Sequence, residues 1–532
     1  MNEQIYYNGY ILTMEDPLYV DSIFVKDKII QKIGNYEEII QLKTPNTEMI
    51  DLNNKTLMPS FIDPHSHISA LANTLSLVTL NDAKSFDDII NKLKSFKESN
   101  NLKDDEWIIG FGYDNNYLVE NSNPTKEILD KASLSNPILI AHASGHMGVA
   151  NSLALKELDI TNETKDPVGG HIGRVCGSNE PNGYMEENAF IHIASKIPQP
   201  SLESTLKLID KAQDIYLSYG ITTVQDGLVN DNEFNLLKAM SDEKKLKVDV
   251  IGYVDLKNSK NIAKNNKDYI KKYKNKYKIG GYKLFLDGSP QGKTAWVTKP
   301  YESSKDNYCG YPIYKNSEVE DFVHVALNEN MQLITHCNGD AAADQLLNSF
   351  INVIEKYNIK YTNRPVMIHA QLVRYDQIDE MKKINMIPSY FVAHTYYWGD
   401  IHIKNFGSIR AFRISPAKTT LDKDVTFTFH QDSPVVPPDM LFTVWCAVNR
   451  ITKDGIIIGE FERISPLDAL KAVTINAAYQ YFEEDIKGSI KEGKLANLII
   501  LDKNPLMVEP IKIKDIKILK TIVEGETLYT NN

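Results

Sequence analysis

Two histidines, His65 and His67, stand one residue apart at the end of an apolar segment that begins at Met58. On a β-strand, residues i and i+2 point to the same side and lie about 6.6 Å apart. Two imidazoles at the end of such a strand can therefore reach one metal ion, with each nitrogen at about 2.0–2.1 Å. A His-x-His pair alone is equally compatible with two surface histidines beside a turn.

Three further polar side chains also close apolar runs. His336 follows Gln-Leu-Ile-Thr, His369 follows Pro-Val-Met-Ile, and Asp432 follows Thr-Phe-Thr-Phe-His-Gln. A single histidine in such a position is more often a hydrogen-bonded core residue. Four histidines and one aspartate at the ends of four runs indicate a common site instead, and imidazole with carboxylate suits a divalent metal.

Lys283 lies inside another apolar run, Tyr-Lys-Leu-Phe-Leu, which ends at Asp287. Burying an ammonium group is costly unless its charge is removed or paired, so burial beside cations favours the neutral amine. A neutral lysine amine can add carbon dioxide and become an anionic carbamate, whose two oxygens could bridge two metal ions. The alternative is a lysine that pairs with Asp287 or extends its amine to the rim.

The elements that would position these residues alternate between short β-rich runs and helical patterns, which is typical of βαβ units in a parallel sheet. Eight β-rich runs are predicted, at residues 57–67, 222–227, 248–254, 281–288, 331–336, 365–372, 386–392 and 425–432. Amphipathic helices are predicted at 202–219, 319–330, 341–357 and 466–482. Eight such units close an α/β, TIM-like (β/α)8 barrel, whose active site lies where the carboxyl ends of the strands meet.

The two ends of the chain carry short alternating apolar and polar groups. Asn8-Gly9 and Lys26-Asp27-Lys28 stand where hairpin turns are expected, and residues 496–502 and 516–525 are also strand-like. Strands from opposite ends of a chain can pair. We therefore predict a small β-sandwich domain formed by residues 1–56 and 485–532, with the barrel over 57–484. Two independent terminal sheets are the alternative.

One interval is too long for a simple barrel crossover, because residues 68–221 separate the first two β-rich runs. Strand-like segments at 107–114 and 137–146, followed by Gly- and Pro-rich stretches, predict an inserted α/β subdomain over residues 75–200. A second long segment, 257–278, is rich in lysine and asparagine and is predicted to be a solvated helix.

Acidic residues outnumber basic ones by 70 to 59, which gives a formal net charge of −11 over 532 residues. Such a field repels phosphate backbones and anionic lipid, so we expect neither a nucleic-acid partner nor membrane binding. No stretch reaches the about 18 apolar residues of a transmembrane helix, and the first residues do not resemble a signal peptide. The four cysteines do not form a zinc-ribbon or disulfide pattern. We expect a cytoplasmic protein with reduced thiols.

Taken together, these residues resemble the amidohydrolase superfamily, specifically the amidohydrolase-3 branch that includes N-substituted formamide deformylases. The order of the candidate metal-site residues along the chain matches that of the family: His65-x-His67, the strand residue Lys283, His336, His369 and Asp432. Supporting segments, which extend the resemblance over nearly the whole chain, are Trp107-Ile-Ile-Gly-Phe-Gly, Ser144-Gly-His146 with Asn151-Ser-Leu-Ala-Leu155, Asp166-Pro-Val-Gly-Gly170, Lys283-Leu-Phe-Leu-Asp-Gly-Ser, His394-Thr-Tyr-Tyr-Trp-Gly-Asp400 and Lys494-Leu-Ala-Asn-Leu-Ile-Ile-Leu-Asp502. One departure is Ser60, where relatives usually carry glycine. It puts the expected local turn in doubt, but not the ligands.

The resemblance implies two divalent metal ions, expected to be Zn²⁺. His65 and His67 would bind one ion, and His336 and His369 would bind the other. Lys283, as a carbamate, and a hydroxide would bridge the two ions. Asp432 would ligate the first ion and transfer protons. The resemblance also implies a β-domain built from both chain ends, in agreement with the strand pattern.

The expected chemistry follows from charge. Metal coordination lowers the pKa of bound water to about 7, and two ions about 3.5–4 Å apart can hold hydroxide and polarise a carbonyl. Asp432 would accept the nucleophile's proton and pass it to the leaving amine. His394 and His146 are the candidate substrate-facing residues. Each either donates a hydrogen bond to the oxyanion or orients a neighbouring ligand.

We therefore predict an amidohydrolase that cleaves a non-peptide C–N bond in a small-molecule amide, N-formyl or N-acyl compound. The first alternative is opening of a cyclic amide or deamination of a ring amine on the same scaffold. A deaminase would usually work with one metal ion. The second alternative is a metal-free, non-catalytic binding protein of the same ancestry, against which the six filled metal-site positions argue. A homodimer is a possible assembly.

Overall fold

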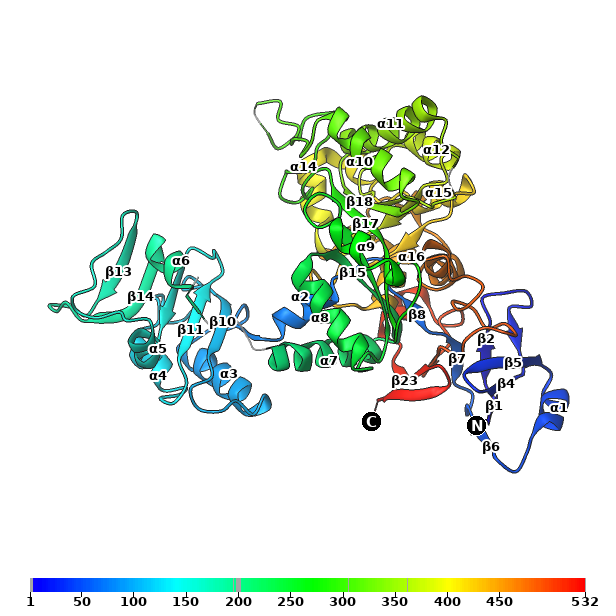
Figure 1. Ribbon diagram of the computed structural model, residues 1–532, viewed down its shortest axis with the longest axis horizontal. Helices are drawn as coiled ribbons and strands as arrows, with labels where there is room; N and C mark the ends of the chain where they lie inside the picture. Colours follow the sequence, from blue (N-terminus) through cyan, green and yellow to red (C-terminus); the bar gives the residue numbers. More distant parts are fainter. Residues whose placement is uncertain (1–2, 195, 198–201, 305, 361, 532) are drawn as a thin grey trace. The chain divides into compact units, whose positions relative to one another are not determined.

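The computed structural model describes residues 3–194, 196–197, 202–304, 306–360 and 362–531 (Figure 1). The chain divides into two compact units, one made of Met1–Leu71 with Ile209–Asn532 and the other of Ala72–Leu208. Residues 1, 200 and 532, at which predicted domains begin or end, lie outside the described residues. Among the described residues, no helix combines the length and apolar character needed to cross a membrane.

The eight predicted β-rich runs all contribute strands to one curled parallel sheet. In spatial order the strands are β8 (Phe61–Ile62), β15 (Ile221–Val229), β16 (Asp249–Asp255), β17 (Tyr277–Phe285), β18 (Gln332–Cys337), β19 (Val366–His369), β20 (Ile387–Tyr390) and β21 (Thr428–Phe429). Beyond the two edge strands, His67 N donates to Ser433 O (2.9 Å) and Asp432 N donates to His65 O (3.2 Å). These bonds join the ends of the sheet, and the architecture is α/β and TIM-barrel-like.

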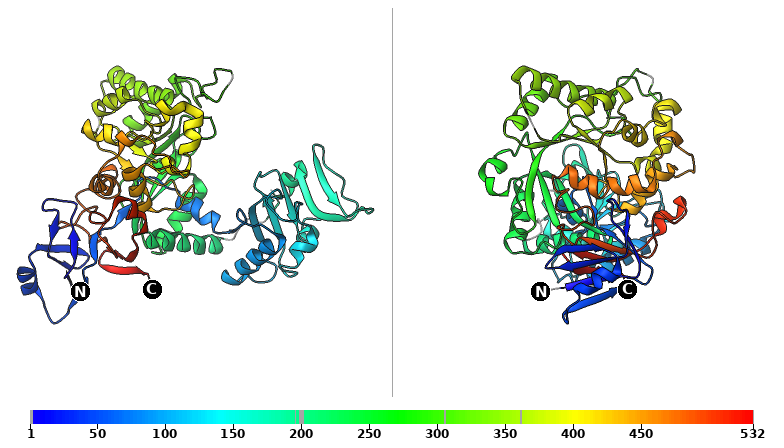
Figure 2. Two further views of the ribbon diagram at one scale, coloured as in Figure 1. Left: turned by 180° about the vertical axis from the view of Figure 1, so that it is seen from behind. Right: turned by 90° about the vertical axis from the view of Figure 1, so that its right-hand side faces the viewer.

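Helices alternate with these strands in sequence (Figures 1 and 2). They include α7 (Leu202–Ser218), α8 (Asp231–Asp242), α10 (Asn316–Asn328), α11 (Asp340–Tyr357), α12 (Tyr375–Lys383), α13 (His394–Tyr397), α14 (Gly399–Ala411), α15 (Ala417–Asp422) and α16 (Met440–Asn449). Each of the longer helices buries one apolar stripe, as Val319, Val323 and Leu327 do in α10. The predicted helix 466–482 is two helices, α17 (Pro466–Ala472) and α18 (Ile475–Gln480), because Thr474 between them is non-helical (φ −132°, ψ −97°).

The two ends of the chain share one sheet, in which β7 (Thr56–Pro59) pairs antiparallel with β22 (Leu498–Leu501). This pairing contradicts the alternative of two independent terminal sheets. The complete order is β24 (Glu526–Thr530), β23 (Ile518–Val523), β22, β7, β2 (Tyr10–Leu12) and β3 (Tyr19–Val20). The first and last parts of the chain are drawn in blue and red in Figure 2.

A four-stranded sheet comes from the N-terminal part alone, in the order β5 (Ile29–Gly34), β4 (Ser22–Lys26), β1 (Glu3–Tyr7) and β6 (Thr47–Asp51). Both terminal sheets supply residues to one buried cluster, which includes Tyr6, Ile23, Leu57 and Ile500. A face-to-face sandwich of the two sheets remains a prediction, as do the domain limits.

The turn predictions at the N-terminus had different outcomes. Asp27 and Lys28 join β4 to β5 as a hairpin, and both adopt positive φ (49° and 76°), as such turns require. Asn8-Gly9 is not a hairpin turn, because β1 and β2 belong to different sheets. Ser60 is buried between β7 and β8, and its Oγ lies 2.6 Å from Thr222 Oγ1.

The predicted long helix over 257–278 is wrong. The segment contains only α9 (Asn261–Asn265) and a 3₁₀ turn at Lys267–Tyr269 before β17 begins at Tyr277. Lys271, Asn275 and Lys276 adopt positive φ, which a continuous helix does not permit. Polar composition indicated a solvated segment but did not distinguish a helix from a series of turns.

The unit Ala72–Leu208 has one six-stranded mixed sheet of its own. Its order is β13 (Gly170–Arg174), β14 (Pro181–Glu187), β12 (Met147–Ala150), β11 (Ile138–His142), β10 (Ile108–Tyr113) and β9 (Leu77–Thr79). The helices α3 (Phe86–Ser99), α4 (Lys126–Asp130), α5 (Ser152–Glu157) and α6 (Asn188–Ala194) belong to the same unit. The predicted insertion, 75–200, lies within the residue range of this unit.

Candidate metal centre

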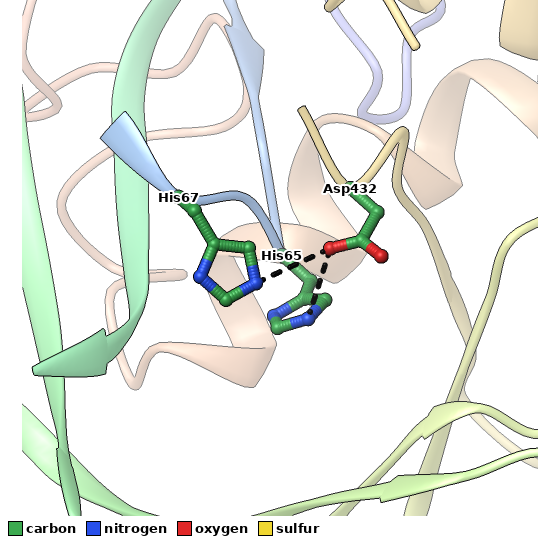
Figure 3. A group of neighbouring side chains, drawn as sticks. All are labelled: His65, His67 and Asp432. Carbon is green, nitrogen blue, oxygen red and sulfur yellow. Dashed lines mark ion pairs between the residues drawn. The ribbon is translucent and has the colours of Figure 1, made fainter. Parts of the chain in front are cut away.

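His65, His67 and Asp432 meet where the sheet closes, directly after β8 and β21 (Figure 3). His65 Nε2 lies 3.4 Å and His67 Nε2 3.3 Å from the same carboxylate oxygen, Asp432 Oδ1. The three ligand atoms are all within 4.8 Å of one another. Both imidazoles therefore point at one acidic oxygen.

The spacing of these atoms fits a shared cation. Asp432 Oδ1 is buried, and among the described residues it has no hydrogen-bond partner. Four ligands at about 2.0–2.1 Å in a tetrahedron stand about 3.3–3.4 Å apart along each edge. The observed separations match that edge, whereas N–H···O hydrogen bonds are usually about 2.9–3.0 Å long. The donor set and its spacing both fit a divalent ion.

Lys283, His336 and His369 extend this group along three neighbouring strands, β17, β18 and β19. Lys283 Nζ lies 3.3 Å from His65 Nε2. His336 Nδ1 and His369 Nε2 are 3.0 Å apart, and His369 Nε2 lies 3.9 Å from Asp432 Oδ2. The structure thus brings all six predicted ligands into one chain of contacts.

The structure contradicts the alternative in which Lys283 pairs with Asp287. The Asp287 carboxylate accepts backbone N–H groups of Trp296, Asn338 and Gly339 instead. Lys283 is 1% exposed, and burial lowers the pKa of its amine to about 7. The neutral amine is therefore accessible near neutral pH, as carbamate formation requires.

Burial also keeps His65, His336 and His369 neutral, as metal ligands must be. It lowers the pKa of His336 to about 4 and holds those of His65 and His369 well below their usual value. For Asp432, burial acts to raise the pKa, but the close imidazoles of His67, His65 and His369 outweigh it and lower the pKa well below its usual range. The site therefore combines neutral imidazoles with an ionised carboxylate.

The partner of the ring nitrogen that points away from the metal centre decides which nitrogen of an imidazole carries the proton. His65 Nδ1 lies 2.6 Å from Gln225 Oε1, an acceptor, because the Gln225 amide nitrogen donates to Pro64 O. This acceptor places the His65 proton on Nδ1, so His65 Nε2 is left free as a ligand atom. His336 Nε2 lies 3.3 Å from the carbonyl of Gly288, an acceptor, and 3.0 Å from Asn338 Nδ2, a donor, so these contacts suit a proton on either of its ring nitrogens.

His430 supports the site, although the sequence did not single it out. Its Nε2 lies 3.1 Å from His369 Nδ1, and its Nδ1 lies 2.9 Å from Ser389 Oγ. Burial lowers the pKa of His430 to about 3. The available signal was its position two residues before Asp432, the same spacing that marked His65 and His67. Gln225 carried no comparable signal.

Two predicted ligands have an unusual backbone conformation. His369 has φ 73° and Asp432 has φ 55°, in the left-handed region that residues other than glycine rarely adopt. Both come at or just after the end of a strand, where this conformation turns the chain while the side chain stays at the site. Such strain is typical of functional positions.

The two candidate substrate-facing histidines lie in different units. His394 is buried and is the first residue of α13. Its ring centroid lies 4.6 Å from that of Phe391, and the Phe391 centroid lies 5.3 Å from that of His430. His146 belongs to the unit Ala72–Leu208, where its exposed side chain places Nδ1 3.2 Å from Glu187 Oε2. The roles of both residues remain predictions.

Comparison with known proteins identifies the family. A family model described as "Amidohydrolase family" matches residues 48–529. Protein LONG AFTER FAR-RED 3 of Arabidopsis thaliana is 28% identical and is aligned over 98% of this chain and 91% of its own length. N-substituted formamide deformylase of Arthrobacter pascens is 25% identical, over 96% of this chain and 94% of its own length.

Comparison with solved structures supports the same family. An uncharacterized metal-dependent hydrolase from Pyrococcus horikoshii OT3 has a TM-score of 0.75 and 26% identity, covering 96% of this chain and 99% of its own. The Aspergillus niger ochratoxinase structure, with a TM-score of 0.53 and 13% identity, shares the fold. The resemblance seen in the sequence is confirmed: this chain belongs to the amidohydrolase family and is a metal-dependent hydrolase of C–N bonds other than peptide bonds.

Proposed function

We propose that this amidohydrolase cleaves a small-molecule amide of the N-formyl or N-acyl class. The observation that carries the proposal is Asp432 Oδ1, a buried carboxylate oxygen with two imidazole nitrogens at 3.3–3.4 Å and no hydrogen bond among the described residues. One relative aligned over nearly the whole chain is named for deformylation of N-substituted formamides.

Six residues would hold two zinc ions. His65, His67 and Asp432 would hold one, His336 and His369 would hold the other, and a carbamate on Lys283 would contact both. When bound, the ions would lower the pKa of water and polarise the substrate carbonyl. The contact between His65 Nδ1 and Gln225 Oε1 leaves His65 Nε2 free for such a role.

The carbamate of Lys283 would form when the neutral Nζ attacks the carbon of carbon dioxide and one Nζ proton leaves to solvent. The product carries one negative charge on two oxygens. Burial of Lys283 supports this step, because it lowers the pKa of the amine to about 7. The charge of the carbamate would balance part of the charge of the ions.

Asp432 would move the proton during hydrolysis. Its carboxylate stays ionised, so it can accept a proton from the attacking water and pass it to the amine nitrogen as the C–N bond breaks. The hydrogen-bonded series His369, His430 and Ser389 would hold the His369 ring, with each N–H donating outward. That direction leaves His369 Nε2 free to face the centre.

A substrate panel with metal analysis tests the proposal. The purified chain should hydrolyse at least one N-formyl or N-acyl amine and should contain about two zinc ions per chain. One tightly bound zinc with an unmodified Lys283 and release of ammonia from a ring amine would replace the proposal with a deaminase. A metal-free chain inactive on the whole panel would support a binding protein instead.

A further inference from the structure

Two buried histidines outside the metal centre form a pair whose protons can be placed. His394, at the start of α13, and His402, within α14, are 4% and 0% exposed. His394 Nδ1 and His402 Nε2 are 3.0 Å apart, and the two ring planes differ by only 2°. One hydrogen bond therefore joins the rings, and one of the two nitrogens must carry its proton.

Both rings are neutral, so each has a single N–H. Burial lowers the pKa of His402 to about 3 and holds that of His394 well below its usual value. Two arrangements remain. Either His394 Nδ1–H donates to His402 Nε2, or His402 Nε2–H donates to His394 Nδ1.

The second ring nitrogen of His402, Nδ1, distinguishes these two arrangements of the protons. His402 Nδ1 is buried and, among the described residues, has no hydrogen-bond partner. If His394 were the donor, the His402 proton would sit on Nδ1 as a buried N–H without an acceptor. If His402 is the donor, Nδ1 is only an unused acceptor. Buried N–H groups without a partner are the rarer and costlier case, so the second arrangement is favoured.

We propose that His402 is a positioning residue that donates its Nε2 proton to His394 Nδ1 and so holds the proton of His394 on Nε2. His394 is then a neutral hydrogen-bond donor and not a base. The role rests on the proposed function: the Nε2–H of His394 would bind the substrate carbonyl oxygen as negative charge develops on it. A neutral imidazole suits this task, since it gives a hydrogen bond without giving up its proton.

The His394 side chain lies within electrostatic range of the centre. Asp432, His430 and His336 all influence the pKa of His394. The centroid of the Phe391 ring lies 4.6 Å from that of His394, 6.1 Å from that of His369 and 5.3 Å from that of His430. The ring centroid of His402 lies 5.3 Å from that of His394 and 6.0 Å from that of Phe406, and we assign the effect of His402 to its hydrogen bond with His394.

The proton position can be measured without substrate. ¹⁵N NMR of the metal-loaded, ¹⁵N-histidine-labelled protein reports which ring nitrogen of each histidine carries hydrogen, and the His394→Gln variant assigns the His394 signals. We expect His394 to be protonated on Nε2. The His402→Gln variant, whose side-chain amide can still donate, should keep that form, whereas His402→Met should shift His394 toward the Nδ1–H form.

Activity provides the second measurement. With the substrate found in the panel, His402→Met should lower kcat by about 10- to 100-fold, with KM, zinc content and Tm near wild type, and His402→Gln should restore most of the rate. Protonation of His394 on Nδ1 in the wild type, or an unchanged His394 signal in His402→Met, would overturn the proposal. Because the NMR result does not depend on turnover, it stands even if no amide substrate is hydrolysed.

Discussion

At the scale of single residues, the proposed function gives Asp432 two tasks that place opposite demands on its carboxylate. As a ligand, its Oδ1 would stay ionised between His65 and His67, 3.4 and 3.3 Å away. As a proton carrier, its other oxygen would take up and release a proton in each turnover. The two oxygens of one carboxylate can divide these tasks, whereas an amide could not perform the second.

Asp432→Asn should lower kcat by about 10²- to 10⁴-fold, the usual contribution of a proton-transfer residue, with the fold retained. Steady-state kinetics with circular dichroism and metal analysis would measure this. Asp424→Asn is a matched control, because the Asp424 side chain is 90% exposed. Near-normal turnover in Asp432→Asn would refute the proposed role.

Lys283→Ala should lose zinc, because the buried amine and the carbamate that it would form are both removed. A short carboxylic acid added to the buffer should restore zinc binding and part of the activity by occupying the same space. Lys404→Ala is the control. Lys404 is an exposed residue of α14, so its replacement should change neither the zinc content nor the activity. Unchanged zinc content in Lys283→Ala without added acid would count against a bridging carbamate.

At the scale of elements, the amino-terminal ends of the barrel strands carry a buried ion cluster that the sequence did not reveal. Lys487, in the segment between α18 and β22, is 2% exposed and pairs with Asp249 at the start of β16 and with Glu483. It also donates to Thr223 Oγ1 in β15 at 3.2 Å. Lys278 in β17 pairs with the same Glu483. One segment thus ties together three strands.

Lys487→Met should destabilise the fold by about 3–5 kcal/mol, since it removes the buried cation that pairs with both Asp249 and Glu483, and Lys276 and Lys278 balance only part of their charge. Urea unfolding measures this difference. Lys238→Met, which breaks an exposed pair with Asp242, should cost less than about 1 kcal/mol. Zinc content and kcat should stay near wild type in both, because the cluster lies at the opposite ends of the strands. A loss below 1 kcal/mol in Lys487→Met would contradict the account.

The same cluster predicts a pH dependence. Burial acts to raise the pKa values of Asp249 and Glu483, but the nearby lysines outweigh it and lower both: Lys487 first, with Lys278, and with Lys276 at Asp249. Lowered carboxyl pKa values stabilise the fold fully above their unfolded values, 3.8 and 4.5, and that stability is lost as the pH falls through the folded values. The difference in unfolding free energy between wild type and Lys487→Met should therefore shrink below about pH 4.5. If the difference in unfolding free energy between wild type and Lys487→Met stayed constant from pH 7 to pH 3, the result would contradict this account of the ion cluster.

At the scale of the whole molecule, the first and last parts of the chain fold as one structure. β22 lies between β7 and β23 in the sheet. Residues of the C-terminal part, such as Ala496, Leu498 and Ile522, belong to the same buried cluster as residues of both terminal sheets. Glu524 at the β23–β24 turn pairs with Lys276 before β17 and with Lys28 in the β4–β5 hairpin. Barrel and terminal strands therefore stabilise one another.

A chain that ends at Leu495 should fail to unfold cooperatively and should aggregate, because β7 would become an exposed edge with buried apolar residues. Removal of residues 526–532, which hold the half-exposed edge strand β24, is the control and should leave a cooperative transition. Calorimetry and size-exclusion chromatography would compare the two. A cooperative transition in the shorter chain would show that the terminal sheets are independent.

Much of the architecture followed from local patterns. The eight strand segments were predictable because each is a short apolar run bounded by polar residues. The candidate ligands could be recognised because five of them stand at the end of such a run, whereas Lys283 lies inside one. Patterns that look alike could not be separated. Asn8-Gly9 suggested a hairpin but connects two sheets, and the lysine-rich segment before β17 suggested a helix but forms turns.

The sequence by itself determined which side chains could bind metal, because residue type and position on a strand are local properties. Only the tertiary structure decided which nitrogen of His65 is free, since that depends on Gln225, which belongs to another element, β15. Likewise, the pKa of Lys283 falls to about 7 only because folding removes its amine from water. Proton positions and pKa values depend on neighbours in space, and a linear chain does not specify those neighbours until it has folded.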